Sequence, residues 1–189
     1  MTTRGKRRHT ARWAAGVVLL GLAVVGVVLA TRTPQEAIPV ESALVGHMAP
    51  QISGTNIQVA GDTKVSLRSL RGHYVFVNFF ASWCVPCRME SAQLMALSKT
   101  PGITLYGVDY EERAPGAGRA FLDELGDPFS RIVTDPHGAA GINWGVYGVP
   151  ETYVVDGKGV VRFKLVGGLT ADALTRQLLP EIEKAKQAT

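Results

Sequence analysis

The stretch that most restricts the fold of this chain is the uncharged run Tyr74–Phe80, YVFVNFF. Aromatic and β-branched residues dominate it, and runs of this kind form strands that are buried on both faces of a sheet. A helix is predicted directly afterwards, over Val85–Ser98, because Pro86 falls in its first turn, where proline is tolerated. A buried strand that passes at once into a helix is typical of a layered α/β domain.

The rest of the chain continues the alternation of strands and helices. The sequence Asp156–Gly159 (DGKG) has the turn chemistry that joins two antiparallel strands. The pattern therefore predicts an α/β fold of three layers with a mixed central sheet and an N-terminal strand extension. The expected elements are a leading strand pair at Ile52–Val59 and Lys64–Leu67, strands at Ile103–Asp109 and Phe129–Thr134, helices at Gly118–Leu125 and around Gly138–Trp144, a hairpin of Thr152–Val155 with Val160–Val166, and a closing amphipathic helix at Ala171–Lys186.

An apolar segment precedes this domain. Ala14–Ala30 carries no polar side chain, and as a helix it would measure about 26 Å at ~1.5 Å per residue, close to a bilayer core of ~30 Å. Basic residues crowd before it, which by the positive-inside rule leaves the N-terminus in the cytoplasm. We therefore expect a cytoplasmic segment at 1–12, a single transmembrane anchor at 13–30, an extended spacer at 31–42 and a folded domain at 43–187 on the far side of the membrane. The alternative is a signal peptide cleaved after Val28–Ala30.

The net charge of +4 belongs to the same N-terminal segment. Five of the basic residues lie before the apolar run, so the remainder is close to neutral. No later stretch interleaves clustered Lys or Arg with aromatic residues, as a phosphate-tracking surface requires, and nucleic-acid binding is excluded.

The two cysteines, Cys84 and Cys87, carry the predicted chemistry. They stand three residues apart at the start of a predicted helix, whose N-terminus favours a thiolate on Cys84. Cys84 is the expected nucleophile toward a target disulfide, and Cys87 would resolve the mixed disulfide. A zinc site would need two more ligands than this pair supplies, and the four histidines are isolated, so no metal is expected. A permanent disulfide would close too small a loop to add much stability.

Several stretches resemble the cytochrome c maturation reductases CcmG or DsbE, a TlpA-like branch of the thioredoxin superfamily. The Gly-Val-Tyr-Gly-x-Pro-Glu-Thr motif is the most specific to this branch. The resemblance implies a thioredoxin-like fold and thiol–disulfide oxidoreductase activity. It is carried by Val45–Pro50, Val77–Cys84, Cys87–Glu90, Gly107–Tyr110 and Gly145–Thr152.

The same resemblance implies roles for residues around the cysteines. Pro150 matches the family's cis-proline, which would let Val149 pair with an incoming peptide strand; the alternative is an ordinary turn proline. Trp83 would belong to the docking surface, with core packing as the alternative. Pro86, between the two cysteines, counts among the supporting residues. Asn78 stands where thioredoxin has a buried aspartate that accepts a proton.

Two glutamates are candidates to replace that missing acid. Glu90 falls on the cysteine face of the helix, three residues after Cys87, and Glu151 follows Pro150. A buried carboxylate at either position would raise the thiol pKa values and could take a proton from Cys87. The alternative for both is a solvated glutamate. The acidic group of Asp109, Glu111 and Glu112 is expected to form a solvated loop.

The resemblance favours a reductant that acts as a monomer in the cytoplasmic membrane, with its catalytic domain on the periplasmic side. Its acceptor would be apocytochrome c or an intermediary thiol protein, and its donor a membrane thiol reductase. No flavin or nicotinamide motif is present, so the cysteine pair is the only expected redox group. A general extracytoplasmic reductase or oxidase is the main alternative. A peroxidase would need a Thr where Ala81 stands, and a haem or metal chaperone would need a His or Met cluster near the pair.

Overall fold

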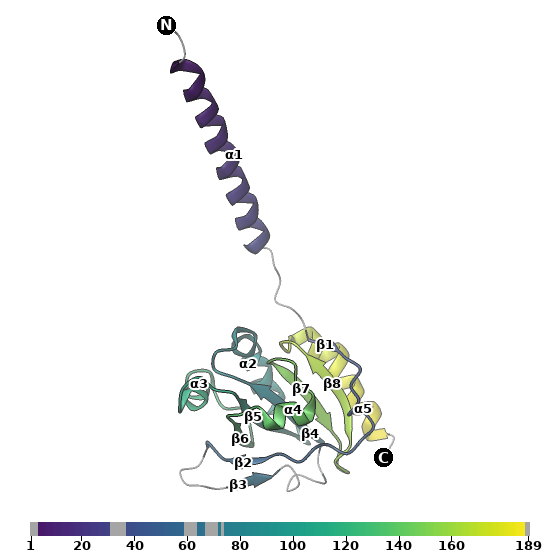
Figure 1. The fold of residues 1–189 in the computed structure, drawn as a ribbon. Helices are drawn as coiled ribbons and strands as arrows, with labels where there is room; N and C mark the ends of the chain where they lie inside the picture. The colour runs from purple at the N-terminus through teal and green to yellow at the C-terminus, as the bar shows by residue number, and fades with distance from the viewer. Residues whose placement is uncertain (1–3, 31–36, 59–63, 67–71, 73, 188–189) are drawn as a thin grey trace. The chain divides into compact units, whose positions relative to one another are not determined.

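The computed structural model describes residues 4–30, 37–58, 64–66, 72 and 74–187. The chain divides into two compact units, Met1–Pro34 and Gln35–Thr189. The first unit holds the helix α1 (Arg4–Ala30; Figure 1). Over the part of the chain that is described, no helix combines the length and apolar content needed to cross a membrane. Residues 1–3 and the first half of the predicted spacer, 31–36, lie outside the described residues.

The second unit is built on a six-stranded sheet with the strand order β1-β8-β7-β4-β5-β6 (Figure 1). β4, β5 and β6 run parallel to one another, whereas the β4–β7, β7–β8 and β8–β1 pairs are antiparallel, which confirms the predicted mixed sheet. The strands are β1 (Ile38–Pro39), β4 (Tyr74–Phe80), β5 (Ile103–Tyr110), β6 (Arg131–Asp135), β7 (Glu151–Val155) and β8 (Val161–Val166).

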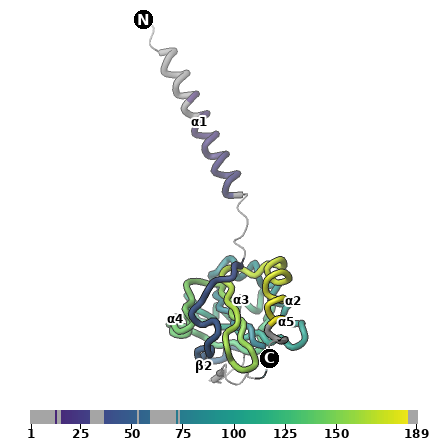
Figure 2. The backbone as a smooth tube through the Cα atoms, turned by 90° about the vertical axis from the view of Figure 1, so that its right-hand side faces the viewer, coloured from purple at the N-terminus to yellow at the C-terminus, as the bar shows by residue number. Residues whose placement is uncertain are grey.

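Helices cover both faces of this sheet, so the domain has the three layers expected. Figure 2 shows α4 (Ala139–Trp144) on one side and α2 (Val85–Leu97) on the other. On the α2 side, α3 (Ala117–Leu125) and the C-terminal helices also contribute side chains to the core. The core on the opposite face includes Trp144 and Phe79 of β4. Because β4 lies between two apolar cores, its uncharged sequence is explained.

The closing helix differs from the single α-helix that the sequence predicts. Its first part, η2 (Ala173–Leu178), is a π-helix, and α5 (Leu179–Gln187) follows. Pro180 lies in the first turn of α5, where its missing N–H and its ring disfavour regular α-helical bonding to the preceding turn. The widened turn accommodates the proline, as π-bulges do elsewhere.

The predicted N-terminal strand extension is confirmed by β2 (Ser53–Thr55) and β3 (Lys64–Ser66), which pair antiparallel; the expected ends at Val59 and Leu67 lie outside the described residues. Asn56, just after β2, bridges to Val133 of β6.

The strand β1 was not predicted, because the sequence analysis assigned 31–42 to a spacer. Ile38 and Pro39 pair with Val166 and Leu165 of β8, and the Ala37 N–H donates to the Gly168 carbonyl oxygen at 3.1 Å. Two residues, one of them a proline, are too few to show a strand period. Part of the predicted spacer is therefore an edge strand.

Candidate active site

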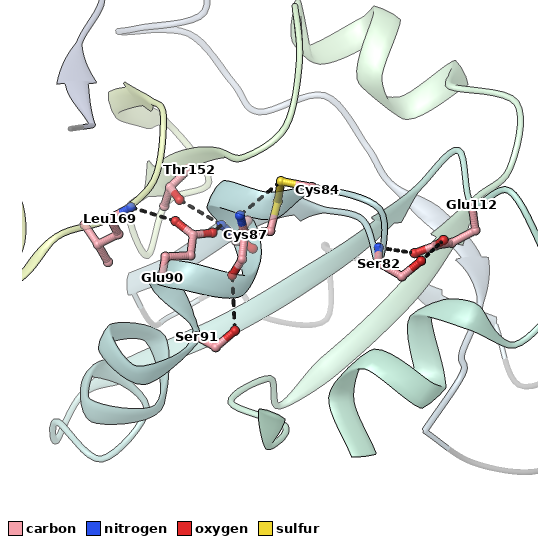
Figure 3. Close-up of a disulfide and its surroundings, with 9 residues drawn as sticks. Ser82, Cys84, Cys87, Glu90, Ser91, Glu112, Thr152 and Leu169 are labelled. Carbon is pink, nitrogen blue, oxygen red and sulfur yellow. Dashed lines mark hydrogen bonds between the residues drawn. A yellow bond between two sulfur atoms is a disulfide. The ribbon is translucent and has the colours of Figure 1, made fainter. Parts of the chain in front are cut away.

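The cysteine pair lies where the central strand passes into α2. Cys84 and Cys87 form a disulfide, and both are buried, with exposed fractions of 4% and 2%. Cys84 is the N-cap residue of α2, and the Cys87 N–H donates to its Sγ at 3.0 Å (Figure 3). Pro86 occupies the first helical turn, as expected. A backbone N–H and a helix N-terminus directed at Sγ favour the thiolate of Cys84 once the pair is reduced.

Glu90 is buried beside the resolving cysteine. It follows Cys87 on the buried face of α2, and the two residues line the same small internal cavity. Its Oε2 accepts from the Leu169 N–H at 2.7 Å (Figure 3), and its Oε1 accepts from Asn78 Nδ2 at 3.0 Å. Burial raises the pKa of Glu90 to about 7, against the opposing effect of these two hydrogen bonds. The alternative of a solvated glutamate is therefore wrong.

Asn78 connects Glu90 to the sheet. It is fully buried in β4, and its Nδ2 also donates to Thr152 Oγ1 of β7 at 3.0 Å. The position that carries the acid in thioredoxin thus holds an amide that orients the carboxyl of α2. Thr152 and Leu169 were not predicted as members of this group, although Thr152 ends the branch-specific motif. Leu169 contributes only its backbone, so its side chain gives no signal.

Glu151, the second candidate acid, lies on the other face of the sheet. Its Oε2 is 3.0 Å from Lys164 Nζ and accepts from the Tyr153 hydroxyl at 3.1 Å, and its Oε1 accepts from the Tyr147 N–H. Tyr153 belongs to the core opposite α2, whereas Thr152 faces Asn78, as alternation along a strand requires. Glu151 is fully buried, but it is paired with Lys164 and not with the cysteines. The structure therefore favours Glu90 as the acid of the thiol site.

The predicted docking residues come from separate segments of the chain. The Val149–Pro150 bond is cis, as the resemblance implied, and Val149 packs against both cores. Trp83 is 37% exposed, which contradicts simple core packing, and its Nε1 donates to the Glu111 carbonyl oxygen at 3.1 Å. Val85 and Met89 extend this exposed apolar surface along the start of α2.

The acidic segment that was predicted to form a solvated loop contacts the turn before Cys84. Asp109 is buried, and Glu112 accepts two hydrogen bonds from Ser82, from its N–H at 2.5 Å and from its hydroxyl at 2.6 Å (Figure 3). Glu111 is exposed, as expected, whereas Asp109 is buried and Glu112 is only partly exposed, because the connection after β5 folds back against the turn before Cys84. Among the described residues, no three His, Cys, Asp or Glu side chains gather closely enough to hold a metal ion.

A Cys-x-x-Cys disulfide at the start of the helix that follows a central strand, in a domain with a cis-proline before β7, defines a thiol–disulfide oxidoreductase of thioredoxin-like fold. Two curated relatives are named thiol:disulfide interchange proteins. The DsbE homologue of Paracoccus denitrificans is 39% identical, over 83% of this chain and 84% of its own. HelX of Rhodobacter capsulatus is 38% identical, over 87% of this chain and 90% of its own. The chain belongs to the CcmG/DsbE family of thiol:disulfide interchange proteins.

Two further comparisons agree with this assignment. The model of the AhpC/TSA family matches residues 45–164. A crystal structure assigned as a DsbE thiol:disulfide interchange protein, from Chlorobium tepidum, superposes with a TM-score of 0.61 and 28% identity over 73% of this chain and 94% of the other.

Proposed function

We propose that this protein is a dedicated extracytoplasmic reductant, which keeps the haem-attachment cysteines of apocytochrome c reduced during cytochrome c biogenesis. Its resemblance to the cytochrome c maturation branch supports this substrate, directly or through an intermediary thiol protein. A general extracytoplasmic reductase or oxidase would share the same cysteine chemistry, so the direction of electron flow and the substrate need separate support.

The buried carboxyl of Glu90 is the observation that carries the reducing direction. When ionised, it places a negative charge beside Cys87 and disfavours a second negative charge on either sulfur. Strong oxidants such as DsbA owe their potential to a stabilised reduced form, in which one cysteine is a thiolate. A neighbouring carboxylate has the opposite effect, because it destabilises the thiolate and makes the dithiol a better electron donor.

The same carboxyl accounts for proton movement in the reaction. The Cys84 thiolate attacks one sulfur of the target disulfide, the target S–S bond breaks, and the released target thiolate takes up a proton. Cys87 then passes its proton to the Glu90 carboxylate and attacks Cys84 Sγ. The Cys84–Cys87 bond forms, the mixed disulfide breaks, and the second target sulfur leaves as a thiolate, which takes the proton from Glu90 and restores the carboxylate. Two electrons have passed from the dithiol to the target.

The roles of the neighbouring residues follow from their positions. We assign peptide docking to Trp83 and to the backbone of Val149 before Pro150, since an exposed aromatic ring and the backbone next to a cis-proline suit an incoming strand. Pro86 would stiffen the turn between the cysteines. The cysteine pair would be the only redox group, so its electrons would come from a membrane thiol reductase.

We also propose that the run Ala14–Ala30 anchors the protein by a single pass in the cytoplasmic membrane, with the catalytic domain on the periplasmic side. The basic segment before the run supports this orientation. Extraction of membranes with alkaline carbonate should leave the full chain in the pellet, and external protease should digest the domain in spheroplasts. Release into the periplasm as a shortened chain would show instead that the segment is cleaved.

The reducing direction is tested by equilibrating the full-length protein in detergent with defined thiol–disulfide buffers. A potential near that of thioredoxin, about −270 mV, is expected, and a value near that of DsbA, about −120 mV, would exclude a reductant.

The substrate is tested by trapping. A Cys87→Ser variant cannot resolve the mixed disulfide, so it should accumulate one with an oxidised peptide that contains Cys-x-x-Cys-His. The matched Cys84→Ser variant should accumulate none. Equal trapping of unrelated disulfide peptides would replace the cytochrome assignment by a general reductase.

A further inference from the structure

A second acidic group lies next to the turn that leads into Cys84. Asp109 ends the buried part of β5, and Glu112 follows three residues later; the two carboxyls contact each other. Asp109 fits closely against α3, because a Cβ at Gly118 would overlap its carboxyl group. In Figure 3, Glu112 and Glu90 lie on opposite sides of the disulfide, so this group is distinct from the Glu90 site.

The hydrogen bonds around these acids indicate where a proton lies. Both oxygens of Glu112 accept from Ser82, which suits an ionised carboxylate. Asp109 is 6% exposed, and its Oδ1 has no hydrogen-bond donor among the described residues. Two ionised carboxylates in contact would repel each other in this buried setting. A proton on Asp109 removes the repulsion and lets it donate to Glu112.

The segment that carries Glu112 also holds Trp83. The Glu111 carbonyl oxygen accepts from Trp83 Nε1 at 3.1 Å, and the Arg113 guanidinium lies over the Trp83 ring, 5.0 Å from its centroid. With the two bonds from Ser82 to Glu112, the connection after β5 makes four contacts to the two residues that precede the nucleophile. The orientation of Trp83 beside Cys84 is therefore set by this connection.

We propose that Asp109 and Glu112 are positioning residues that share one proton and hold the Ser82–Trp83 turn, and with it the Trp83 docking surface, in front of Cys84. Loss of the shared proton places a second negative charge against Glu112 and loosens its hold on the turn. Burial and the contact with Glu112 raise the pKa of Asp109 to about 8, so the proton is present at neutral pH.

Within the part of the chain that the structure describes, few other charges act on the pair. From the β4–α2 turn it meets the neutral Ser82, and from α3 it meets Gly118, which has no side chain. The neighbouring cations are engaged elsewhere: Arg113 with Trp83, Arg88 of α2 with Glu124, and Arg119 of α3 with Asp123 and Asp127.

The first test measures tryptophan emission of the oxidised full-length protein between about pH 6 and about pH 10, where the disulfide-bonded cysteines do not titrate. Subtracting the spectrum of a Trp83→Phe variant isolates Trp83. A transition near pH 8 is expected. Asp109→Asn should abolish it, Glu112→Gln should move it to lower pH, and Glu90→Gln should leave it in place. A transition that persists in Asp109→Asn, or none in the wild type, would overturn the proposal.

The second test rests on the proposed reductase function. With the oxidised Cys-x-x-Cys-His peptide at neutral pH, Glu112→Gln should raise KM about tenfold while kcat changes by less than about twofold, because a charge-assisted contact to the docking turn is lost. Glu181→Gln, a partly exposed acid on α5, is the matched control and should leave both constants unchanged. A fall in kcat alone would contradict a positioning role. If the wild type does not reduce this peptide, the proposed function fails. The emission titration still tests separately whether Asp109 and Glu112 share a proton and position Trp83.

Discussion

Replacing Glu90 by Gln should stabilise the oxidised protein at neutral and alkaline pH. Burial raises the pKa of this carboxyl from 4.5 to about 7, so between these values the folded protein retains a proton that the unfolded chain has lost. The free energy of unfolding therefore falls as the pH rises through this interval, and the loss is complete above the folded-state pKa. At ~1.4 kcal/mol per pKa unit, the penalty reaches roughly 3 kcal/mol.

The substitution preserves the shape of the group and can preserve its hydrogen bonds. The glutamine oxygen can still accept from the Leu169 N–H. Its amide can donate to Asn78 Oδ1, which has no partner among the described residues, once the Asn78 side chain turns over. The hydroxyl of Thr152 can then donate to the same oxygen. The change therefore removes the titration, and the flipped Asn78 Nδ2 takes the unpaired position that its Oδ1 held, so the number of unpaired side-chain atoms does not rise.

Urea unfolding of the oxidised wild type and Glu90→Gln at pH 4.5 and pH 8 measures the effect, because subtraction cancels the contribution of every other acid, including Asp109. The difference should grow from near zero at the lower pH to roughly 3 kcal/mol in favour of the variant. Glu124→Gln, at an exposed position, should show no such growth. A difference between wild type and Glu90→Gln that stays constant with pH would refute a buried, titrating Glu90.

Three further predictions concern the same domain. Lys164→Met should destabilise the protein by about 3–5 kcal/mol in urea unfolding, since Glu151 would be left buried without its cation, and adding Glu151→Gln should recover part of the loss. Gly118→Ala should cost about 1–3 kcal/mol in the same assay because its Cβ overlaps the Asp109 carboxyl, and pairing it with Asp109→Ala should relieve the cost. In the reduced protein, Glu90→Gln should lower the thiol pKa values and shift the reduction potential toward more oxidising values. The thiol pKa values are measured by thiolate absorbance, and unchanged values would exclude a tuning role for Glu90.

The sequence predicted correctly those parts of the fold that depend on interactions between residues close together in the chain. The strand Tyr74–Phe80, the helix after it and the placement of Cys84 at their junction follow from one apolar run, a proline at a tolerated position and a short spacing. The mixed sheet followed from the hairpin turn at Asp156–Gly159. These features depend on hydrophobic periodicity and turn chemistry, which the chain carries within a few residues.

Interactions between distant segments were not predictable in the same way. Glu90 and Glu151 looked equivalent in sequence, but Leu169 and Asn78 surround the first, while Lys164 neutralises the second from across the sheet. The acidic stretch after β5 looked like a solvated loop because its contacts with the turn before Cys84 lie about thirty residues away along the chain. A charge pattern alone cannot show which acids lose their water.

The two residues of β1 protect the sheet from self-association. Exposed strand edges offer unpaired N–H and C=O groups on which other chains can add strands and form aggregates. Ile38 and Pro39 cover part of the outer side of β8, and Pro39 has no N–H with which to recruit a further strand. At the opposite edge, the bridge from Asn56 to Val133 covers part of β6. If the protein acts as the extracytoplasmic reductant proposed above, it would bind extended substrates repeatedly, and both margins of its own sheet are poorly suited to templating their aggregation.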